Sequence, residues 1–270
     1  MCRFLAYSGP PTSMQELLLD SPHSLVRQSK HARMRHDPVN GDGFGVGWYP
    51  THEDPEPGTF VSIEPAWSNR NLLQIATKIH TPLFFAHVRD ATPGMPVSQT
   101  NCHPFRHGPW LWMHNGFLGD FSQWRRELLG SLSDNAFNLI QGNTDSEHVF
   151  AMFMDEVGFN SEASAAIGAA ELLKALNNCI KKLIQIKSNA GCNAQAHMNF
   201  AVSNGHVSLF SRLSIDAGEP PPTLHYLIDE ASCVVASEPL SDSSDWQEVD
   251  QGQVLVLEKE SGLRIEEISL

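Results

Sequence analysis

The second residue, Cys2, combines two reactive groups if the methionine before it is removed. The chain begins with the residues MCRFLAYS, so loss of Met1 would leave a cysteine with a thiol and a free α-amine. An α-amine has a pKa of about 8, and its unprotonated fraction can act as a base for the thiol beside it. Cys2 is therefore a candidate nucleophile. The alternative is a small apolar residue that opens a buried strand.

Two charged residues could hold the two ends of an α-amino acid. Arg89 follows the apolar run LFFAHV, and Thr92 lies three residues further on. A guanidinium and a hydroxyl placed in this way can bind a carboxylate together. Asp145 opens an expected helix and could bind an ammonium group. Each residue has a structural alternative, because Arg89 could pair with Asp90 at the surface and Asp145 or Thr144 could cap the helix.

The dipeptide Asn115-Gly116 follows the apolar run WLWMH, which is typical of a buried strand. We expect the strand to end there and to expose a carboxamide beside an unhindered backbone N–H. Two such donors at one point form an oxyanion hole, which stabilises the tetrahedral intermediate of acyl transfer. The alternative is an ordinary turn, since Asn-Gly is a common turn dipeptide.

Other residues allow competing interpretations. Cys102 could replace Cys2 as the nucleophile, but it has no free amine. The histidines His87, His103, His107 and His114 could bind a metal ion, but the chain has no HExxH motif and no paired CxxC motif, so we expect no metal. Glycines alternate over 41–47, but no helix follows them, so close backbone approach is a better interpretation than a nucleotide site.

Composition excludes several classes of protein. The net charge of −13 argues against binding to nucleic acid or to an anionic membrane. No signal peptide and no membrane-spanning apolar run is recognisable. The five cysteines are odd in number and scattered, which argues against a disulfide framework. We therefore expect a cytoplasmic protein that needs no cofactor.

Apolar runs and turn residues predict strands, then helices, then strands. This order indicates two sheets with helices on their outer faces, in a single domain over residues 1–270. Asn204-Gly205 indicates a tight hairpin. The expected helices are Asn71–Ile79, Asp145–Val157 and Glu162–Lys187. The expected strands are Phe4–Tyr7, Phe44–Tyr49, Leu83–Val88, Trp110–Met113, Met198–Ser203, His206–Arg212, Leu224–Ile228, Cys233–Ala236, Val254–Glu258 and Leu263–Ile268.

Taken together, these residues resemble the class II glutamine amidotransferases, which are N-terminal-nucleophile hydrolases. The resemblance spans the whole chain and is closest to the stand-alone members of the family. It implies an α+β fold with four αββα layers, in which two mainly antiparallel sheets are flanked by helices. The motifs that carry it are MCRFL at residue 1, NGDGFGV at 40, NCHPF at 101, GNTDSE at 142 and VASEPL at 235.

The resemblance also implies a reaction. Cys2 would attack a γ-glutamyl amide and form a thioester, which water would later hydrolyse. Asn115 and the Gly116 N–H would stabilise the oxyanion, while Arg89 with Thr92 would bind the α-carboxylate and Asp145 the α-ammonium. His103 would help to shape the substrate site.

The substrate would be a small γ-glutamyl molecule, either glutamine or another γ-glutamyl compound. The chain has no room for a second catalytic domain, so a second protein subunit could accept the ammonia or act as a peptidase. Three alternatives stay open: a γ-glutamyl peptide hydrolase of thiol metabolism that ignores free glutamine, a non-enzymatic scaffold subunit, and a metal-dependent hydrolase.

Overall fold

The computed structural model describes residues 2–35, 38–51, 54, 56–92, 94–159, 167–215, 218–229, 231–258 and 262–270. One of its two antiparallel sheets, sheet A, consists of β1 Arg3–Ser13, β2 Phe44–Tyr49, β3 Gly58–Ser62, β4 His80–Val88, β10 His225–Ile228, β11 Cys233–Ala236 and β12 Gln247–Glu248. The strand order is β12-β10-β11-β1-β4-β2-β3. The strand that begins just after Cys2 is therefore central in its sheet.

The second sheet, sheet B, lies against the inner face of sheet A. It consists of β5 Phe105–His107, β6 Trp110–Leu118, β7 Ala196–Ser203, β8 Val207–Arg212, β13 Gln253–Glu258 and β14 Gly262–Glu267, with the short β9 Ser214–Ile215 paired to β7. The strand order is β14-β13-β8-β7-β6-β5. The hairpin predicted at Asn204-Gly205 is confirmed, because it joins β7 to β8 with Gly205 at φ 89°.

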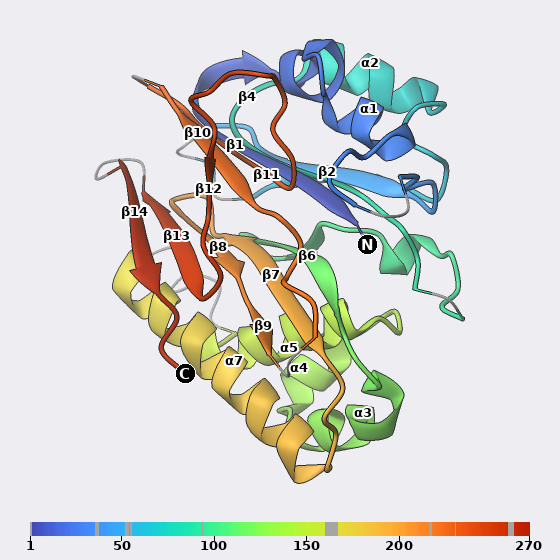
Figure 1. The fold of residues 1–270 in the computed structure, drawn as a ribbon, viewed down its shortest axis with the longest axis vertical. Coiled ribbons are helices and arrows are strands. Elements are labelled where there is room, and N and C mark those ends of the chain that lie inside the picture. Colours follow the sequence, from blue (N-terminus) through green and yellow to red (C-terminus); the bar gives the residue numbers. More distant parts are fainter. Residues whose placement is uncertain are drawn as a thin grey trace.

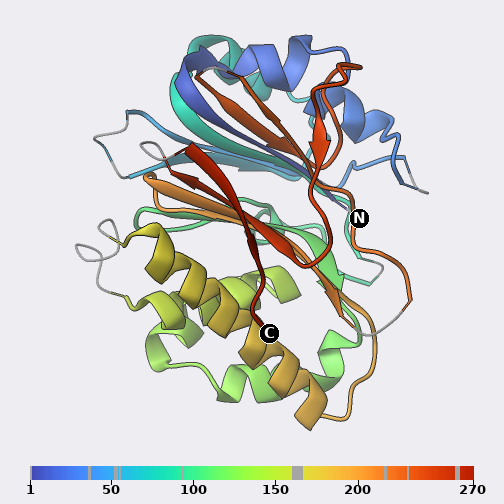
Figure 2. The ribbon, with the colours of Figure 1, turned by 60° about the vertical axis from the view of Figure 1, so that its left-hand side comes forward.

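Helices cover the outer face of each sheet, as Figures 1 and 2 show. Sheet A carries the π-helical turn Glu16–Asp20, α1 Leu25–Lys30 and α2 Arg70–Lys78. Sheet B carries α3 Phe121–Gly130, α4 Asp134–Leu139, α5 Asp145–Val157 and α7 Ala169–Asn189. The four-layer αββα arrangement expected from the sequence is therefore confirmed.

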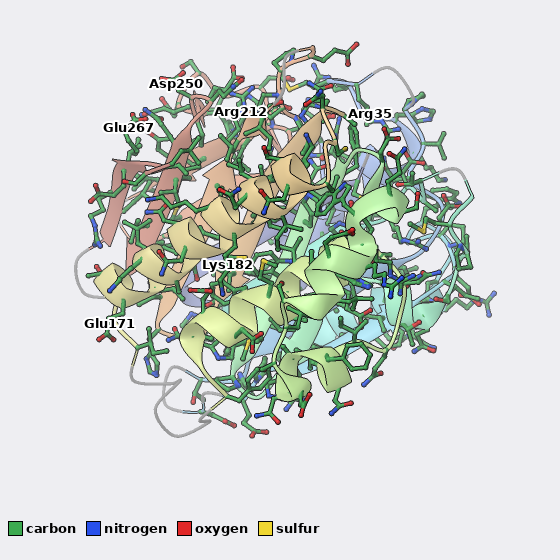
Figure 3. The ribbon with its side chains drawn as sticks, turned by 90° about the horizontal axis from the view of Figure 1, so that it is seen from below. Arg35, Glu171, Lys182, Arg212, Asp250 and Glu267 are labelled. Carbon is green, nitrogen blue, oxygen red and sulfur yellow. The ribbon has the colours of Figure 1, made fainter. Side chains whose placement is uncertain are left out.

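Apolar side chains fill all three spaces between the layers. Between the sheets, Phe4 and Phe85 of sheet A pack with Met113 and Phe210 of sheet B. Under α7, buried residues recur every three or four positions, which is the pattern of a helix with one apolar face. Figure 3 shows this helical layer from below, with Lys182 of α7 labelled. Nζ of Lys182 lies 2.5 Å from a carboxylate oxygen of Glu156 in α5. No helix among the described residues is long and apolar enough to cross a membrane.

Most predicted elements are present, with two corrections. The strand predicted to end at Met113 continues as β6 to Leu118, so Asn115 and Gly116 lie within a strand and not in a turn. The helix predicted from Glu162 begins at Ala169 in the structure, and residues 160–166 lie outside the described part of the chain. The sequence predicts no helix at α1, α3 or α4, which are short or have a mixed pattern of apolar and polar residues.

The alternating glycines of β2 mark a close backbone approach, as predicted. A Cβ atom built on Gly45 would lie 2.2 Å from the carbonyl oxygen of His103. A Cβ on Gly47 would lie 2.9 Å from the side chains of Leu111 and Pro104. Because these positions carry no side chain, the segment that includes His103 can cross directly over β2.

Candidate active site

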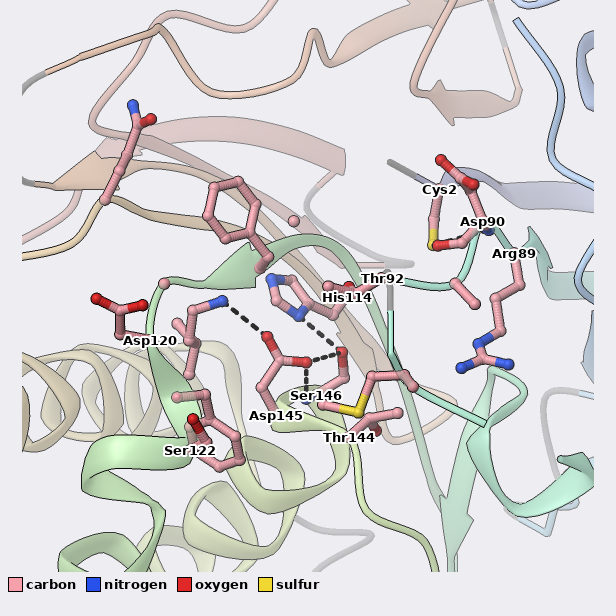
Figure 4. A pocket seen from close by; sticks show the side chains of 18 of the residues that line it. Cys2, Arg89, Asp90, Thr92, His114, Asp120, Ser122, Thr144, Asp145 and Ser146 are labelled. Atoms are coloured by element: carbon pink, nitrogen blue, oxygen red, sulfur yellow. Dashed lines mark hydrogen bonds between the residues drawn. The ribbon is translucent and has the colours of Figure 1, made fainter. Parts of the chain in front are cut away.

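Six of the predicted site residues line one cavity of about 560 Å³. Cys2 enters it from the start of β1, and Arg89 from the end of β4. Asp145 enters from the N-terminus of α5. Figure 4 shows these side chains from close by. The fold thus joins residues that are more than 140 positions apart in the chain. The six are Cys2, Arg89, Thr92, His103, Gly116 and Asp145.

The thiol of Cys2 is buried at the wall of this cavity. Its Sγ lies 3.5 Å from the backbone nitrogen of Asp90 and 3.6 Å from the carbonyl oxygen of the same residue. Burial raises the pKa of the thiol, so the group stays protonated at neutral pH and needs a base to become a nucleophile. Among the described residues, no side chain forms a hydrogen bond with it. Met1 lies outside the described residues.

Arg89 supplies a positive charge that has no carboxylate partner within the described chain. Its side chain is buried, and its guanidinium donates only to the carbonyl oxygens of Asp42 at 3.5 Å and Pro96 at 3.3 Å. The alternative that it pairs with Asp90 is wrong, because Asp90 contacts Arg35 at 2.6 Å. Such a cation can bind an anionic group of a ligand. Thr92 is exposed at the rim of the same cavity.

Asp145 does not act as the cap of its helix. Thr144 is the N-cap, and its Oγ1 accepts the N–H of Glu147 at 3.3 Å. The carboxylate of Asp145 instead accepts the N–H of Leu118 at 2.7 Å and the N–H of Ser146 at 2.8 Å. The bond to Leu118 ties α5 to β6. Oδ1 also accepts the hydroxyl of Ser146 at 3.3 Å, so Oδ2 is the oxygen that keeps a free lone pair for a ligand.

The N–H of Gly116 points to the side of β6 that faces away from β7. N–H groups two residues apart on a strand point the same way, and the N–H of Leu118 leaves this side to reach Asp145. The opposite side is crowded, since a Cβ on Gly116 would lie 2.1 Å from the carbonyl oxygen of His197. Glycine therefore allows β6 and β7 to pair closely here and leaves one N–H directed toward the cavity.

The side chain of Asn115 does not line the cavity. It is fully buried between the sheets, and its Nδ2 donates to Oγ of Ser237 at 3.2 Å. Its Oδ1 has no hydrogen-bond donor among the described residues. The expectation of an exposed carboxamide is therefore wrong, because Asn115 lies inside a paired strand and its side chain faces sheet A. Ser237 follows β11 in the segment VASEPL, which was noticed in the sequence without a role.

His103 is a neutral imidazole against the cavity wall. Burial and then the neighbouring His87 lower its pKa well below the usual range. The centroids of the two rings lie 4.2 Å apart with the ring planes tilted by 34°, and neither ring nitrogen of His103 has a hydrogen-bond partner in the described chain. His87 has a pKa lowered to about 3 by burial, and its Nε2 lies 3.2 Å from the carbonyl oxygen of His114. Within the part of the chain described, no three potential ligands gather around a metal position.

Cys102 is a poor candidate for the nucleophile. It is buried, it does not line the cavity, and its Sγ donates to the carbonyl oxygen of Ser62 at 3.4 Å. Burial raises its pKa to about 11. A thiol of this kind is inert at neutral pH.

The loop before Asp145 is held by two residues that the sequence analysis gave no such role. Oδ1 of Asn101 accepts the N–H of Asn143 at 3.2 Å. The buried carboxylate of Glu147 accepts the N–H of Gly142 at 2.7 Å. Both residues stand in motifs that the sequence shows. Spacing along the chain does not reveal the bond of Asn101, however, because it joins segments 42 residues apart.

The family of the protein follows from this fold and site together with comparison to known proteins. A family model described as glutamine amidotransferases class-II matches residues 20–267. The chain belongs to this family, as its motifs indicated. It is 34% identical to the probable glutamine amidotransferase DUG3 of Saccharomyces cerevisiae, over 97% of this chain and 83% of that protein.

Two further relatives extend the comparison. The chain is 28% identical to the γ-glutamyl-hercynylcysteine sulfoxide hydrolase of Mycolicibacterium smegmatis, over 92% of each protein. Its fold matches the structure of a glutamine aminotransferase class-II domain protein from Silicibacter pomeroyi with a TM-score of 0.70, 25% identity and 99% coverage of both chains.

Proposed function

We propose that this protein hydrolyses a γ-glutamyl amide bond with Cys2 as the nucleophile. One observation carries the proposal. A thiol, an unpaired buried guanidinium, a carboxylate and a directed backbone N–H all face the same cavity. A γ-glutamyl compound has an α-carboxylate, an α-ammonium and a carbonyl carbon, which match these groups. The names of the relatives and the shared family support the same class of reaction.

Binding would use the charges that the free protein leaves available. The α-carboxylate would pair with Arg89 and accept a hydrogen bond from Thr92 at the rim. The α-ammonium would pair with Asp145, whose Oδ2 keeps a free lone pair. His103, with both ring nitrogens unpartnered, can donate one hydrogen bond and accept another at the cavity wall. These contacts would place the γ-carbonyl against Cys2.

The reaction would proceed in two halves. The α-amine exposed by loss of Met1 would take the thiol proton as the sulfur attacks the γ-carbonyl carbon. The Gly116 N–H would stabilise the oxyanion, and the Asn115 carboxamide, which is buried outside the cavity in the free protein, would join it after its side chain turns. The α-amine then passes this proton to the nitrogen of the substrate amide, which leaves as ammonia or an amine, and a thioester remains on Cys2. Water then attacks the thioester, which releases glutamate and restores the thiol.

A second candidate substrate is a γ-glutamyl compound with a large leaving group. The cavity continues past Asp145 to Asp120, Ser122 and Gln195. In Figure 4, Asp145 lies between Arg89 and Asp120. The cavity of about 560 Å³ has room beyond the groups that would hold the glutamyl part, and the name of one relative, a γ-glutamyl-hercynylcysteine sulfoxide hydrolase, favours such a substrate. Ammonia release from glutamine and glutamate release from glutathione, measured side by side, would separate the two candidates.

The first experiment is intact-mass spectrometry before and after treatment with diazo-oxo-norleucine, an electrophile that mimics glutamine. Loss of Met1 and one adduct on Cys2 are expected, with the same result in a Cys102→Ala control. An adduct on Cys102, or none on a protein that has lost Met1, would contradict the proposal. A chelator is expected to leave turnover unchanged, whereas a metal-dependent hydrolase would lose it.

A partner and a compartment stay as predictions. A second subunit that accepts ammonia or cleaves the released peptide would make a complete pathway step with this chain. A reducing, cytoplasmic setting would suit the five cysteines, all of which are free thiols. Copurification from the native source, followed by mass spectrometry, would test the partner.

A further inference from the structure

Ser237 connects the strand that carries Cys2 to the carboxamide of Asn115. Ser237 is fully buried, and its N–H donates to the carbonyl oxygen of Phe4 at 3.0 Å. Its Oγ accepts the N–H of Phe4, also at 3.0 Å. The same Oγ lies 3.2 Å from Nδ2 of Asn115, across the space between the two sheets. One serine therefore contacts both the nucleophile strand and the residue proposed for the oxyanion hole.

With the Asn115 carboxamide in its present orientation, the Ser237 hydroxyl and Oδ1 of Asn115 each lack one hydrogen-bond partner. A serine hydroxyl has one hydrogen and two lone pairs, and both lone pairs here receive N–H groups. The hydroxyl hydrogen then has no acceptor among the described residues, and Oδ1 of Asn115 has no donor. Buried polar groups are nearly always paired.

A half-turn of the Asn115 carboxamide would give the Ser237 hydroxyl hydrogen an acceptor and Oδ1 of Asn115 a donor. The turn exchanges Oδ1 and Nδ2, which have almost the same size, so it needs no extra space. Ser237 could then accept the Phe4 N–H and donate its own hydrogen to Oδ1 of Asn115. Nδ2 would move to the place that Oδ1 now holds and would no longer donate to Ser237. Because Asn115 directly precedes Gly116, which lines the cavity, Nδ2 would then be available to an oxyanion that forms beside Gly116.

We propose that Ser237 is a positioning residue that holds Asn115 in this half-turned orientation during catalysis. It acts through Asn115 and touches no substrate atom. Because it also holds Phe4, it sets the place of the oxyanion donor relative to Cys2. The proposal rests on the proposed function, since the oxyanion forms only when the thiol attacks a carbonyl.

A double-mutant cycle tests the proposal. Steady-state rates are measured on L-glutamine or glutathione, whichever the wild type hydrolyses, for Ser237→Ala, Asn115→Ala and the double variant. Ser237→Ala is expected to lower kcat about tenfold with KM nearly unchanged, since one aligned hydrogen bond is lost. In the Asn115→Ala background the same change is expected to have no further effect on kcat.

Two results would overturn the proposal. One is an unchanged kcat in Ser237→Ala. The other is a tenfold loss in both backgrounds, which would mean that Ser237 acts by holding β1 and not through Asn115. Ser208→Ala is the matched control, because Ser208 is also buried on a strand but its hydroxyl contacts Ser203, at the opposite end of the β6–β7 pair.

A second measurement tests the orientation without any activity. The side-chain amide signals of Asn115 in a ¹⁵N-labelled protein can be identified by their absence from the Asn115→Asp spectrum. They are expected to shift in Ser237→Ala and to stay in place in Ser208→Ala. Unchanged signals in Ser237→Ala would refute the contact. If the wild type hydrolyses neither substrate, the proposed function fails, and this measurement still decides whether Ser237 orients the carboxamide.

Discussion

Replacing Arg89 by methionine should remove recognition of the substrate α-carboxylate while leaving the fold intact. Arg89 is 3% exposed, and among the described residues its guanidinium donates only to two carbonyl oxygens, at 3.3 and 3.5 Å. These contacts are long, and no described carboxylate neutralises the charge. The free protein therefore gains little from this cation, and the substrate would form its first ion pair.

The expected loss of activity can be worked out from the ion pair that the substrate would form with Arg89. A bound carboxylate would receive two charge-assisted hydrogen bonds, and truncating one partner of such a buried pair costs about 2–5 kcal/mol. At about 1.4 kcal/mol for each factor of ten, kcat/KM for glutamine should fall roughly 30- to 3000-fold. Tm should change little, because a methionine has similar length and removes a buried charge that had no partner.

The assay compares two substrates in two proteins. L-Glutamine and 4-aminobutanamide, which lacks the α-carboxylate, are given to the wild type and to Arg89→Met. The variant should lose most of its rate on glutamine and almost none on the truncated amide. Arg106→Met is the control, because Arg106 is a partly exposed residue that pairs with Glu56 at 3.1 Å. An equal loss on both substrates would refute the role, since the arginine would then act on something other than the carboxylate.

Three further predictions concern stability and pH. Arg3 forms a buried ion pair with Glu238 at 2.8 Å, so Arg3→Met should leave the buried carboxylate without its cation. The free energy of unfolding should fall by about 3–5 kcal/mol, or Tm by roughly 6–20 °C, and an unchanged melting curve would contradict this. Burial lowers the pKa of His87 to about 3, so the unfolded chain binds more protons below pH 6.5 and stability should fall as the pH falls. Between pH 7 and pH 5, the urea-unfolding free energy of His87→Phe should decline by about 2 kcal/mol less than that of the wild type, and equal declines would contradict the assignment. Burial raises the pKa of the Cys2 thiol, so iodoacetamide alkylation of the free protein should accelerate through the alkaline range; a rate that levels off below pH 8 would exclude this.

Much of the fold was predictable because its signals are local. The strands Phe44–Tyr49 and Cys233–Ala236 and the helix Asp145–Val157 have the predicted bounds. Their apolar runs, turn residues and cap lie within a few positions of each other. The start of α7 and the helices α1, α3 and α4 were not predicted, because their ends depend on packing against a sheet, sheet A for α1 and sheet B for the others, and not on a local stop signal.

The candidate site divides in the same way. The chain by itself determined which reactive groups are present: a cysteine that can become the N-terminus, an arginine after a buried strand, and a carboxylate at a helix start. It also showed where glycine is needed, because a missing Cβ is a property of one residue.

The tertiary structure alone decided which of these groups meet and which are already bonded. It paired Asp90 with Arg35 and left Arg89 without a carboxylate partner in the described part of the chain. It placed Asn115 inside β6 and against Ser237, which is 122 residues away in the chain. Hydrogen-bond partners across two packed sheets depend on strand order and register, and neither quantity is encoded in the spacing of a single segment.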